Sequence, residues 1–440
     1  MASITGWGRH PVVEGSEILS EDLEDATRDA RLTRGLGRSY GDSSLPAKPA
    51  DRVAGTRLAD RLLAFDPETG RLRAEAGLSL AKLHAIFLPR GWASPVAPGT
   101  EHVTLGGMVA ADVHGKNHHR AGSFGEHVRA LRMRVADGRV LEVTDEREPE
   151  LFRATLGGMG LMGHVLEVEL DLERIPSPWL VEASERVSSL DELLARLRAA
   201  SEEWPFSVAW ADVLARGARL GRGIVIGGRW AEAHEAPRAL PRRRFTPVLP
   251  FDLPGFVWSR PAMRAFNALW YRRHPRGRRQ RIVAPGRFFH PLDAVRSWNR
   301  AYGKHGMTQY QAVLPREAAD TGMRRLFEIL VGSGEGTFLC VVKDFGREGR
   351  GLLSFPRPGL TLSVDVPVRG ERTQALVDRL NEVVLEAGGR VYLAKDAFTR
   401  PEHFRVMERR LAAFLDMRRK WDPEGRLASA QSVRLFGDRA

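Results

Sequence analysis

The sequence predicts an α+β protein with two main domains and a short C-terminal return. The chain has 440 residues, which at roughly 100–200 residues per domain corresponds to two or three domains. Glycine-rich loops separate short β-like segments in the first part, whereas longer strands mix with amphipathic helices after about residue 174. We therefore expect one domain over 1–173, a second over 174–389, and a segment over 390–440 that docks back on the first.

The composition excludes several classes of protein. Hydrophobic residues make up 43% of the chain, which excludes low-complexity disorder, and the single Cys340 excludes a disulfide scaffold. The N-terminus has no apolar core of a signal peptide, and no uninterrupted apolar stretch is long enough to span a membrane. We expect a protein that is cytoplasmic or peripheral at the inner membrane face.

The positive charge is distributed unevenly between the two basic residue types. The formal net charge is +12, and 60 of the 67 basic residues are arginine. No zinc-finger spacing or aromatic RNA-binding motif accompanies this charge, so we expect no nucleic-acid partner. Unlike arginine, lysine can lose its proton when buried, which makes each retained lysine a candidate functional position. The seven lysines are Lys48, Lys82, Lys116, Lys304, Lys343, Lys395 and Lys420.

Short strands and tight turns are expected in the first domain. Residues 71–76 alternate in polarity, and residues 128–135 and 139–143 flank the turn Ala136-Asp137-Gly138, which predicts a hairpin. Leucine or valine alternates with glutamate or aspartate over 166–172. This pattern predicts a half-buried strand with one charged face.

Longer elements are expected in the second domain. A helix should begin at Ser188 or Ser189, because Ser189 and Glu192 fit a capping box ahead of a leucine-rich stretch. Residues 372–387 place apolar residues on one helical face, and Gly388-Gly389 should end that helix. The expected strands lie at 207–213, 223–226, 309–314, 337–342, 360–366 and 390–395.

The segment 251–281 differs from the rest of the chain. It interleaves six aromatic residues with an arginine-rich run over 272–281. Such a segment fits a disordered loop, a mobile lid over a site, or an interfacial patch whose aromatic residues enter a bilayer while arginine meets lipid phosphate. The last two interpretations are compatible.

The glycine-rich loops do not match the usual dinucleotide turn. Gly35, Gly37 and Gly41 miss the G-x-G-x-x-G spacing by one residue. The run Gly158–Gly163 has the spacing but precedes the strand at 166–172, so no helix N-terminus follows to hold a pyrophosphate. The loops can still form concave nests of backbone N–H groups that bind phosphate, or they can be simple turns.

Residues 106–128 hold the most unusual cluster of side chains. Four histidines, a lysine and Asn117 lie among small residues, a composition that favours close approach of the backbone to a ligand. His114 and His118 have the spacing of a helical metal pair. Gly115 argues against a helix, and neither cysteines nor several carboxylates lie nearby, so we expect no metal.

Three segments resemble the flavin-contacting segments of the vanillyl-alcohol oxidase superfamily. They read RGLGRSYGD at 34–42, TLGGMVAADVHGKNHHRAGSFGEHV at 104–128 and ATLGGMGLMGHV at 154–165. A closer resemblance over roughly 34–431 is to the decaprenylphosphoryl-ribose 2′-oxidase family, the flavin subunits of arabinose-forming epimerases. It is carried by the 114–128 segment and by FFHPLDAVRSWNRAYG, TQYQAVLP, LSFPRPG, GGRVYLAKD and KWDPEGRLAS. The resemblance implies a two-domain FAD-binding fold with an α/β substrate domain.

The resemblance also implies which residues bind FAD. Many superfamily members attach FAD covalently through a histidine in the first loop, but this chain has Arg38 there and no histidine between 34 and 45, which implies non-covalent FAD. The implied FAD contacts are Gly35, Leu36, Gly37, Arg38, Ser39, Tyr40, Gly99, Thr104, Gly106, Gly107, His114, Gly115, Lys116, Asn117, Gly163, Val165 and Tyr392.

The implied reaction is oxidation of the 2′-hydroxyl of decaprenylphosphoryl-β-D-ribose to a 2′-keto sugar. An alcohol needs a base to take its proton while hydride leaves the same carbon, and Lys395 and His114 are the two candidates. Ser363 stands where mycobacterial relatives carry a cysteine beside the flavin. The implied catalytic residues are Lys395, His114 and Tyr40, and the implied substrate-binding residues are Lys116, Gln309, Gln311, Lys343, Ser363 and Asp365.

Two other functions fit the same sequence. One is FAD-dependent oxidation of a soluble sugar or alditol, and the other is an arginine-rich membrane- or nucleic-acid-binding module without catalysis. The leading interpretation implies three partners: a polyprenyl-phosphate sugar as substrate, an NADH-dependent short-chain reductase, and a peripheral membrane surface.

Overall fold

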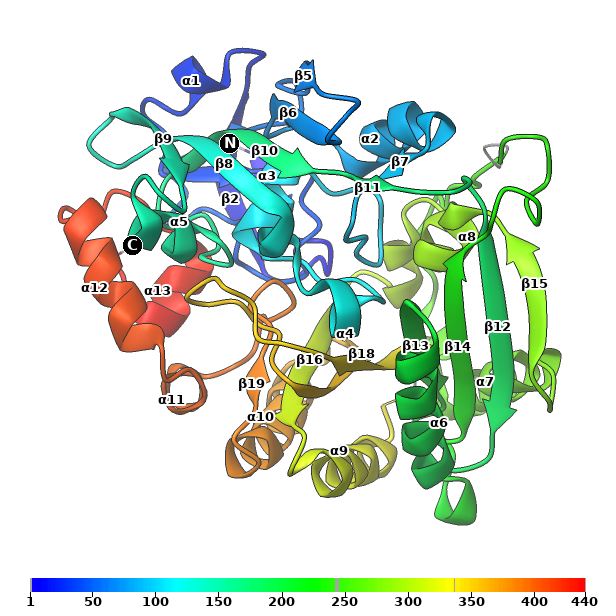
Figure 1. Cartoon of the computed structure of the whole chain (residues 1–440). Helices are drawn as coiled ribbons and strands as arrows, with labels where there is room; N and C mark the ends of the chain where they lie inside the picture. Colours follow the sequence, from blue (N-terminus) through cyan, green and yellow to red (C-terminus); the bar gives the residue numbers. More distant parts are fainter. Residues whose placement is uncertain (1, 242–244, 336, 440) are drawn as a thin grey trace.

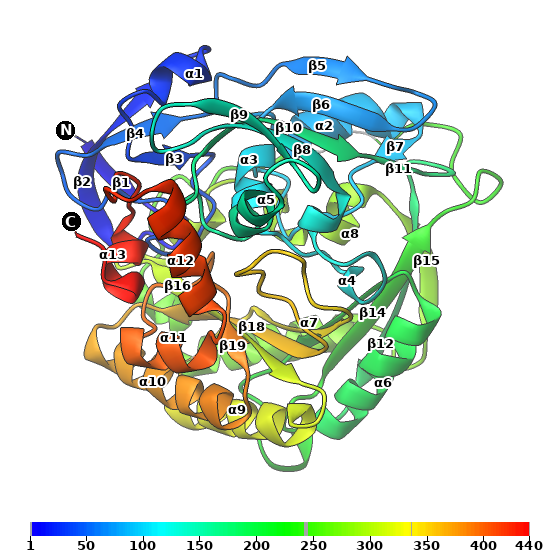
Figure 2. The same cartoon turned by 60° about the vertical axis from the view of Figure 1, so that its left-hand side comes forward.

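The computed structural model describes residues 2–241, 245–335 and 337–439. Figures 1 and 2 show the first third of the chain above a large sheet formed by the middle of the chain. The C-terminal helices lie beside the first part in both views.

Two sheets organise the first part of the chain. One has the order β1-β2-β4-β3, and its β2–β4 and β3–β4 pairs are parallel. The other has the order β5-β6-β10-β8-β9 and is antiparallel. The first sheet contains β1 (Ala2–Thr5), β2 (Val12–Leu19), β3 (Leu32–Arg34) and β4 (Arg52–Gly55); the second contains β5 (Leu62–Phe65), β6 (Arg71–Glu75), β8 (Val128–Arg134), β9 (Val140–Thr144) and β10 (His164–Asp171).

Both strand predictions for this part are confirmed. β8 and β9 form the expected hairpin, and Gly138 in its turn has φ +92°. β10 alternates buried and half-buried residues, and its outward carboxylates pair with arginines of neighbouring strands, as Glu167 does with Arg73 and Arg132. β10 lies between β6 and β8, so these ion pairs cover the half-exposed face of a central strand.

Short helices connect these strands. Three of them begin at a side-chain cap: Asp22 accepts a hydrogen bond from the Asp25 N–H, Ser79 accepts one from the Lys82 N–H, and Thr104 accepts one from the Gly107 N–H. The helices are α1 (Leu23–Ala26), α2 (Leu80–Phe87), α3 (Leu105–Ala110), α4 (His118–Ala121) and α5 (Pro149–Thr155), and a small ribbon joins β7 (Trp92–Ala93) to β11 (Glu173–Arg174).

An antiparallel sheet of eight strands forms the second part, in the order β15-β12-β14-β13-β17-β18-β16-β19. Its central strands are buried throughout because both faces are covered. The strands are β12 (Leu180–Val187), β13 (Phe206–Ala211), β14 (Gly223–Trp230), β15 (Arg279–Val283), β16 (Met307–Pro315), β17 (Cys340–Phe345), β18 (Gly359–Pro367) and β19 (Arg390–Val391).

Three helices cover one face of this sheet, as Figure 2 shows along its lower side. They are α6 (Leu190–Glu203), α9 (Ala319–Ser333) and α10 (Glu371–Glu386). The predicted cap of α6 is confirmed at Ser189, although the Glu192 carboxylate accepts its hydrogen bonds from Ser188. Since side chains alternate along a strand, every second residue of the sheet turns away from these helices, toward the first part of the chain.

The segment 251–281 is mostly regular in structure. It contains α7 (Arg260–Arg273) and the start of β15, and α8 (Pro285–Phe289) follows it. α7 buries Met263 and Asn267 but leaves Leu269 70% exposed. None of the helices in the described ranges has the length and apolarity needed to cross a membrane.

The C-terminal residues contact the first part of the chain through backbone and charge. The Ala430 N–H donates to the Leu45 carbonyl (3.0 Å), and the Arg434 guanidinium pairs with Asp42 (2.8 Å) and Asp396 (2.8 Å). The helices here are α11 (Pro401–Met407), α12 (Leu411–Trp421) and α13 (Ala430–Phe436). β19 still pairs with β16, so the return to the first part begins after Val391.

Candidate active site

A cavity of about 1900 Å³ lies between the glycine loops of the first part and the face of the large sheet that is turned away from α6, α9 and α10. Ligand pockets commonly span about 300–1000 Å³, so this cavity has room for a large cofactor and a second ligand. The sheet contributes side chains from alternate positions of four strands. β16 and β17 supply the polar groups Gln309, Gln311 and Lys343, whereas β13 and β14 supply the apolar and aromatic residues Val208, Trp210, Ile224 and Ile226. The cavity is therefore built from both main parts of the chain.

The glycine loops form a cradle that side chains would fill. Gly37 has φ +63°, and a Cβ on it would lie 2.3 Å from the Arg34 Nη2 atom. A Cβ on Gly35 would lie 2.4 Å from Thr104 Oγ1, so glycine is needed to bring the loop after β3 against the start of α3. Close approach of bare backbone suits a phosphate-bearing ligand.

Arg38 supplies a positive group to this cradle. Its guanidinium lies over the Trp7 ring (4.0 Å to the centroid), and its Nε atom is buried without a hydrogen-bond partner. Burial lowers the pKa of Arg38, and Asp293 and Tyr40 oppose the shift. An unpaired buried guanidinium N–H in a wall of glycine fits an anionic cofactor.

Most of the predicted FAD contacts line this cavity. Gly106, Asn117, Gly163 and Val165 do not: a Cβ on Gly106 would abut Ala76, Asn117 donates to the Pro95 carbonyl (2.7 Å), and Val165 pairs with Met133 in the sheet. The predicted contacts that line it are Gly35, Leu36, Gly37, Arg38, Ser39, Tyr40, Gly99, Thr104, Gly107, His114, Gly115, Lys116 and Tyr392.

Strand register brings the polar side chains of the sheet together. β16 and β18 pair so that Gln309 lies opposite Asp365 and Gln311 lies opposite Ser363. Directly opposed residues of an antiparallel pair point to the same face. This register places four of the predicted substrate-binding residues in one patch, although Asp365 lies behind Gln309 and does not itself line the cavity.

Asp365 is the centre of a buried hydrogen-bond network. Its carboxylate accepts from the Tyr302 hydroxyl (2.8 Å) and from the Gln309 amide, which also lies 3.4 Å from the Tyr40 hydroxyl. Burial raises the pKa of Asp365, and the hydrogen bonds and Lys395 oppose the shift. The network fixes the Gln309 amide and places a negative charge beside the cavity.

Lys395 is held against Tyr40. The Tyr40 N–H donates to the Ala394 carbonyl (2.9 Å), and the Lys395 ammonium lies 3.9 Å from the Tyr40 ring centroid. Burial lowers the pKa of Lys395, while Asp365 opposes this shift. A lysine in this setting has an accessible neutral form that can accept a proton.

Two further lysines are buried in the same cavity. Burial, together with Lys116 and Lys395, lowers the pKa of Lys343 to about 7. Burial lowers the pKa of Lys116 to about 8 against the opposing effect of Glu182, and its ammonium donates to the Phe289 carbonyl (3.0 Å). In the described part of the chain, the lysines that form ion pairs within 4.0 Å are Lys82 and Lys420, both at the surface. The buried three therefore remain available to an anionic ligand.

The hydrogen-bond network defines the state of His114. Thr361 donates to the Ala312 carbonyl (2.9 Å), so its oxygen accepts from the Gln311 amide (3.2 Å), which in turn donates to His114 Nε2 (3.0 Å). The ring proton therefore belongs on Nδ1, which is buried without a partner. Burial, and next the charges of Lys343, His118 and Lys395, hold the pKa of His114 well below its usual value. His114 is thus a neutral imidazole with a free donor.

The sequence predictions omitted two members of the site. Tyr302 orients Asp365, and Thr361 orients Gln311. Thr361 precedes Ser363 by two residues on one strand, so period-two alternation could have identified it. No local pattern marks Tyr302, which reaches the site from a short 3-10 turn.

One mouth of the cavity is apolar and basic. Phe245, Phe266, Trp270, Arg273 and Arg281 line it. Phe245 is 91% exposed, so the cavity opens to solvent beside it. Large exposed aromatic groups bordered by arginine mark an interaction surface.

The chain is similar to known oxidases, in one case over nearly its whole length. The model of the FAD binding domain matches residues 20–144. A decaprenylphosphoryl-β-D-ribose oxidase of Mycolicibacterium smegmatis is 35% identical over 450 residues, covering 98% of this chain and 97% of that protein. An uncharacterised protein from the mprA 5′ region of Streptomyces coelicolor is 37% identical over 371 residues, covering 81% of this chain and 100% of that protein. L-gulonolactone oxidase of Mus musculus is 32% identical over 140 residues, covering 31% of this chain and 30% of that protein.

These matches confirm the α+β FAD-binding fold and the FAD cofactor expected from the sequence. The cradle, the unpaired Arg38 and the cavity volume independently fit a large anionic cofactor. The chain belongs to the decaprenylphosphoryl-β-D-ribose oxidase family of FAD-dependent oxidoreductases.

Proposed function

We propose that this protein oxidises the 2′-hydroxyl of decaprenylphosphoryl-β-D-ribose to the 2′-keto sugar. The observation that carries the proposal is the gathering of Lys116, Lys343 and Lys395 with His114 and two glutamines in the FAD cavity. Cations suit a sugar phosphate, and amides suit ring hydroxyls. Membership of the family supports the same substrate.

We assign the base to Lys395. Oxidation requires the hydroxyl proton to leave as hydride leaves the same carbon, and bound FAD supplies the hydride acceptor. The lowered pKa of Lys395 gives it a neutral amine that takes this proton, and Asp365 stabilises the ammonium that forms.

His114 has a different part in the proposal. Its Nε2 lone pair already accepts from Gln311, so it is poorly placed to accept a second proton. Its Nδ1–H can donate to the oxygen that becomes the carbonyl, and Gln311 holds the ring in this tautomer. Lys343 and Lys116 then bind the phosphate or the remaining ring hydroxyls, and Tyr40 supports Lys395.

We propose that the polyprenyl chain leaves through the apolar mouth. The phosphate would lie among the lysines while the chain passes Phe245 and Trp270 toward a membrane surface. Of the two expected locations, cytoplasmic or peripheral at the inner membrane face, this arrangement supports the peripheral one.

The keto product needs a second enzyme. Conversion to the arabinose epimer requires hydride to return to the same carbon, and this chain has no nicotinamide-binding turn. We propose that an NADH-dependent short-chain reductase is the partner that consumes the product.

Anaerobic reduction of the bound FAD tests the substrate assignment. Polyprenylphosphoryl ribose should bleach the flavin absorbance within one turnover, while free ribose and free alditols at equal concentration should not. Bleaching by the free alditols alone would show a soluble-sugar oxidase instead. A colourless protein that takes up no FAD would exclude both enzymes.

A further inference from the structure

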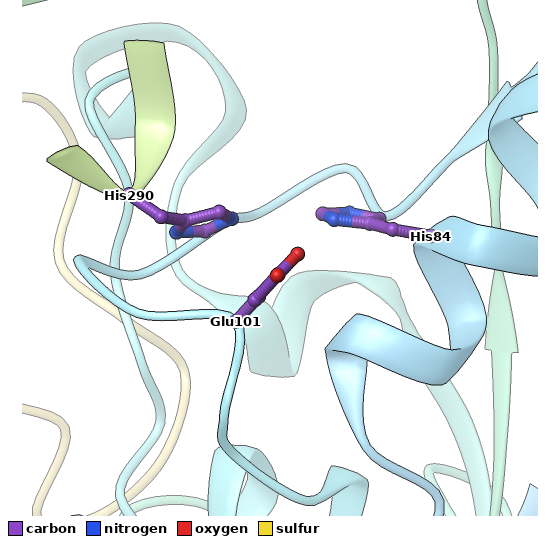
Figure 3. A group of neighbouring side chains, drawn as sticks. All are labelled: His84, Glu101 and His290. Carbon is purple, nitrogen blue, oxygen red and sulfur yellow. The ribbon is translucent and has the colours of Figure 1, made fainter. Parts of the chain in front are cut away.

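Three potential metal ligands converge in the wall of the FAD cavity. Figure 3 shows the rings of His84 and His290 facing each other with the Glu101 carboxylate directed between them. Their ligand atoms all lie within 4.8 Å of one another, and the two ring centroids are 6.0 Å apart. Two imidazoles and one carboxylate are the protein ligand set of many zinc sites.

Each ligand comes from a different segment. His84 lies on α2, Glu101 lies in the loop that precedes α3, and His290 directly follows α8 of the second part. The helical ligand and the loop ligand belong to the FAD-binding part, whereas His290 comes from the segment between β15 and β16. An ion bound here would therefore link the two main parts of the chain.

The backbone already holds these segments in place. The Ala81 N–H at the start of α2 donates to the Glu101 carbonyl (2.9 Å), and the Glu101 N–H donates to the Asp293 carboxylate (2.8 Å). Asp293 also accepts from the Thr100 hydroxyl (2.8 Å). The ligands consequently converge without any ion to assemble them, which lowers the entropic cost of binding one.

His290 has an unsatisfied ring. Both of its ring nitrogens are buried, and neither makes a hydrogen bond of normal geometry. A buried polar atom without a partner calls for a ligand, and a bound ion would supply one.

We propose that His84, Glu101 and His290 bind one Zn²⁺ ion that fastens the segment after α8 to the loop before α3. This proposal departs from the sequence-based expectation of no metal. No spacing motif marks the site in the sequence, because His290 is distant in the chain from His84 and Glu101. All three residues line the cavity wall, so a fourth coordination position is open to water.

The ion would affect the active site by fixing the position of His290. Lys116 donates to the carbonyl of Phe289, the neighbour of His290, so fixing His290 also fixes the acceptor of a buried lysine. The proposal concerns a structural ion and does not depend on the identity of the substrate.

Zinc titration of the FAD-bound protein tests the proposal directly. After chelator treatment and dialysis, the wild-type protein should bind one equivalent of Zn²⁺ in competition with a chromogenic chelator. Glu101→Gln and, separately, His290→Gln should weaken binding at least about tenfold, the scale seen when even a supporting partner of a ligand is removed. His127→Gln is the matched control, since His127 is partly buried, bonds the Ala121 carbonyl and lies outside the cluster. Mg²⁺ should not compete, because it prefers oxygen ligands.

A second measurement separates binding at this site from binding elsewhere. Zn²⁺ should slow hydrogen exchange of the amides over 286–294 in the wild-type protein but not in Glu101→Gln, with FAD absorbance confirming that the variant is folded. The absence of a stoichiometric zinc ion, or equal zinc affinity in the wild-type protein and both ligand variants, would overturn the proposal. Neither readout uses turnover, so a failed substrate assignment would leave this result intact.

Discussion

The three buried lysines share one property that arginine cannot supply. Lys116, Lys343 and Lys395 lose part of their affinity for a proton because the cavity strips them of water. A guanidinium in these positions would remain charged at every physiological pH. The lysines therefore give the site both cationic binding groups and a base.

Removing the ammonium of Lys395 should separate cofactor binding from catalysis. We expect Lys395→Met to retain bound FAD but to lose about 10²–10⁴-fold in turnover, the usual contribution of a general base. Stopped-flow flavin reduction measures this loss. Lys82→Met is the control, because Lys82 is a surface lysine paired with Asp60. Near-normal reduction by Lys395→Met would remove Lys395 from the mechanism.

Lys343 should make stability depend on pH with a definite sign. Its pKa is about 7 in the folded protein and about 10.4 when unfolded, so the unfolded chain binds more protons between these values. The stability contributed by this group should then rise with pH across that window, by at most about 1.4 kcal/mol per pH unit. Lys343→Met should raise Tm at or below neutral pH, and its advantage should shrink as pH approaches 10. A Tm difference that stays constant with pH would contradict this account.

At the residue scale, the sequence indicated most of the polar site. Lysine is rare in a chain that otherwise uses arginine, and Gln309 and Gln311 lie on one strand within the segment TQYQAVLP. The roles of Lys395 and His114 needed the structure, because only the chain from Thr361 through Gln311 shows which nitrogen of His114 carries the proton. Such a network joins β16, β18 and the loop before α4, and no local pattern encodes it.

At the element scale, strand register and glycine turns position the chemistry. The pairing of β16 with β18 opposes Gln309 to Asp365, and a one-residue slip of β16 would turn Gln309 away from the cavity. The helix faces on the other side of the sheet hold this register through buried apolar residues such as Leu376 and Leu380 of α10. Packing on one face thus determines which side chains reach the other.

A glycine substitution tests the cradle. Gly37→Val should abolish or greatly weaken FAD binding. A β-branched residue rarely adopts φ +63°, and its Cβ would clash with the Arg34 side chain. Gly138→Val is the matched control, since Gly138 also has positive φ but lies in the β8–β9 hairpin away from the cavity. The ratio of flavin absorbance to protein absorbance measures both. Equal FAD content in the two variants would show that the Gly37 loop does not hold the cofactor.

Sequence patterns predicted regular elements better than unusual ones. The β8–β9 hairpin and α10 follow from alternation, turn chemistry and helical spacing. α7 was not expected as a helix, because its apolar residues do not all face the core and several of them remain exposed. In that helix, apolar residues lie both on the buried face and on the exposed surface.

At the scale of the whole molecule, the active site exists only between the two main parts. The glycine cradle comes from the first part, Lys343 comes from β17 of the second part, and Lys395 follows β19 in the return segment. Contacts such as Arg434 with Asp42, separated by 392 residues, keep the return segment on the first part. Long-range contacts of this kind cannot be read from local periodicity, although the family resemblance implied them.

The exposed apolar residues of the 251–281 segment should bind membranes independently of catalysis. We expect the triple variant Phe251→Ser, Phe256→Ser and Leu269→Ser to lose at least about tenfold in affinity for anionic vesicles, because burial of each large side chain contributes about 1.5–3 kcal/mol. Vesicle sedimentation measures the affinity. Leu62→Ser with Leu63→Ser on β5 is the control, since these leucines are also exposed but lie far from the mouth. Equal binding by both variants would locate the membrane contact elsewhere.

Isotope substitution in the sugar tests the central claim most directly. Anaerobic FAD reduction should be slowed severalfold by polyprenylphosphoryl ribose that carries deuterium on C2′, because the C2′–H bond breaks when hydride leaves. Deuterium on C3′ should leave the rate unchanged, and the product should be the 2′-keto sugar. A slowed rate with the C3′ label and none with the C2′ label would contradict oxidation at the 2′-hydroxyl.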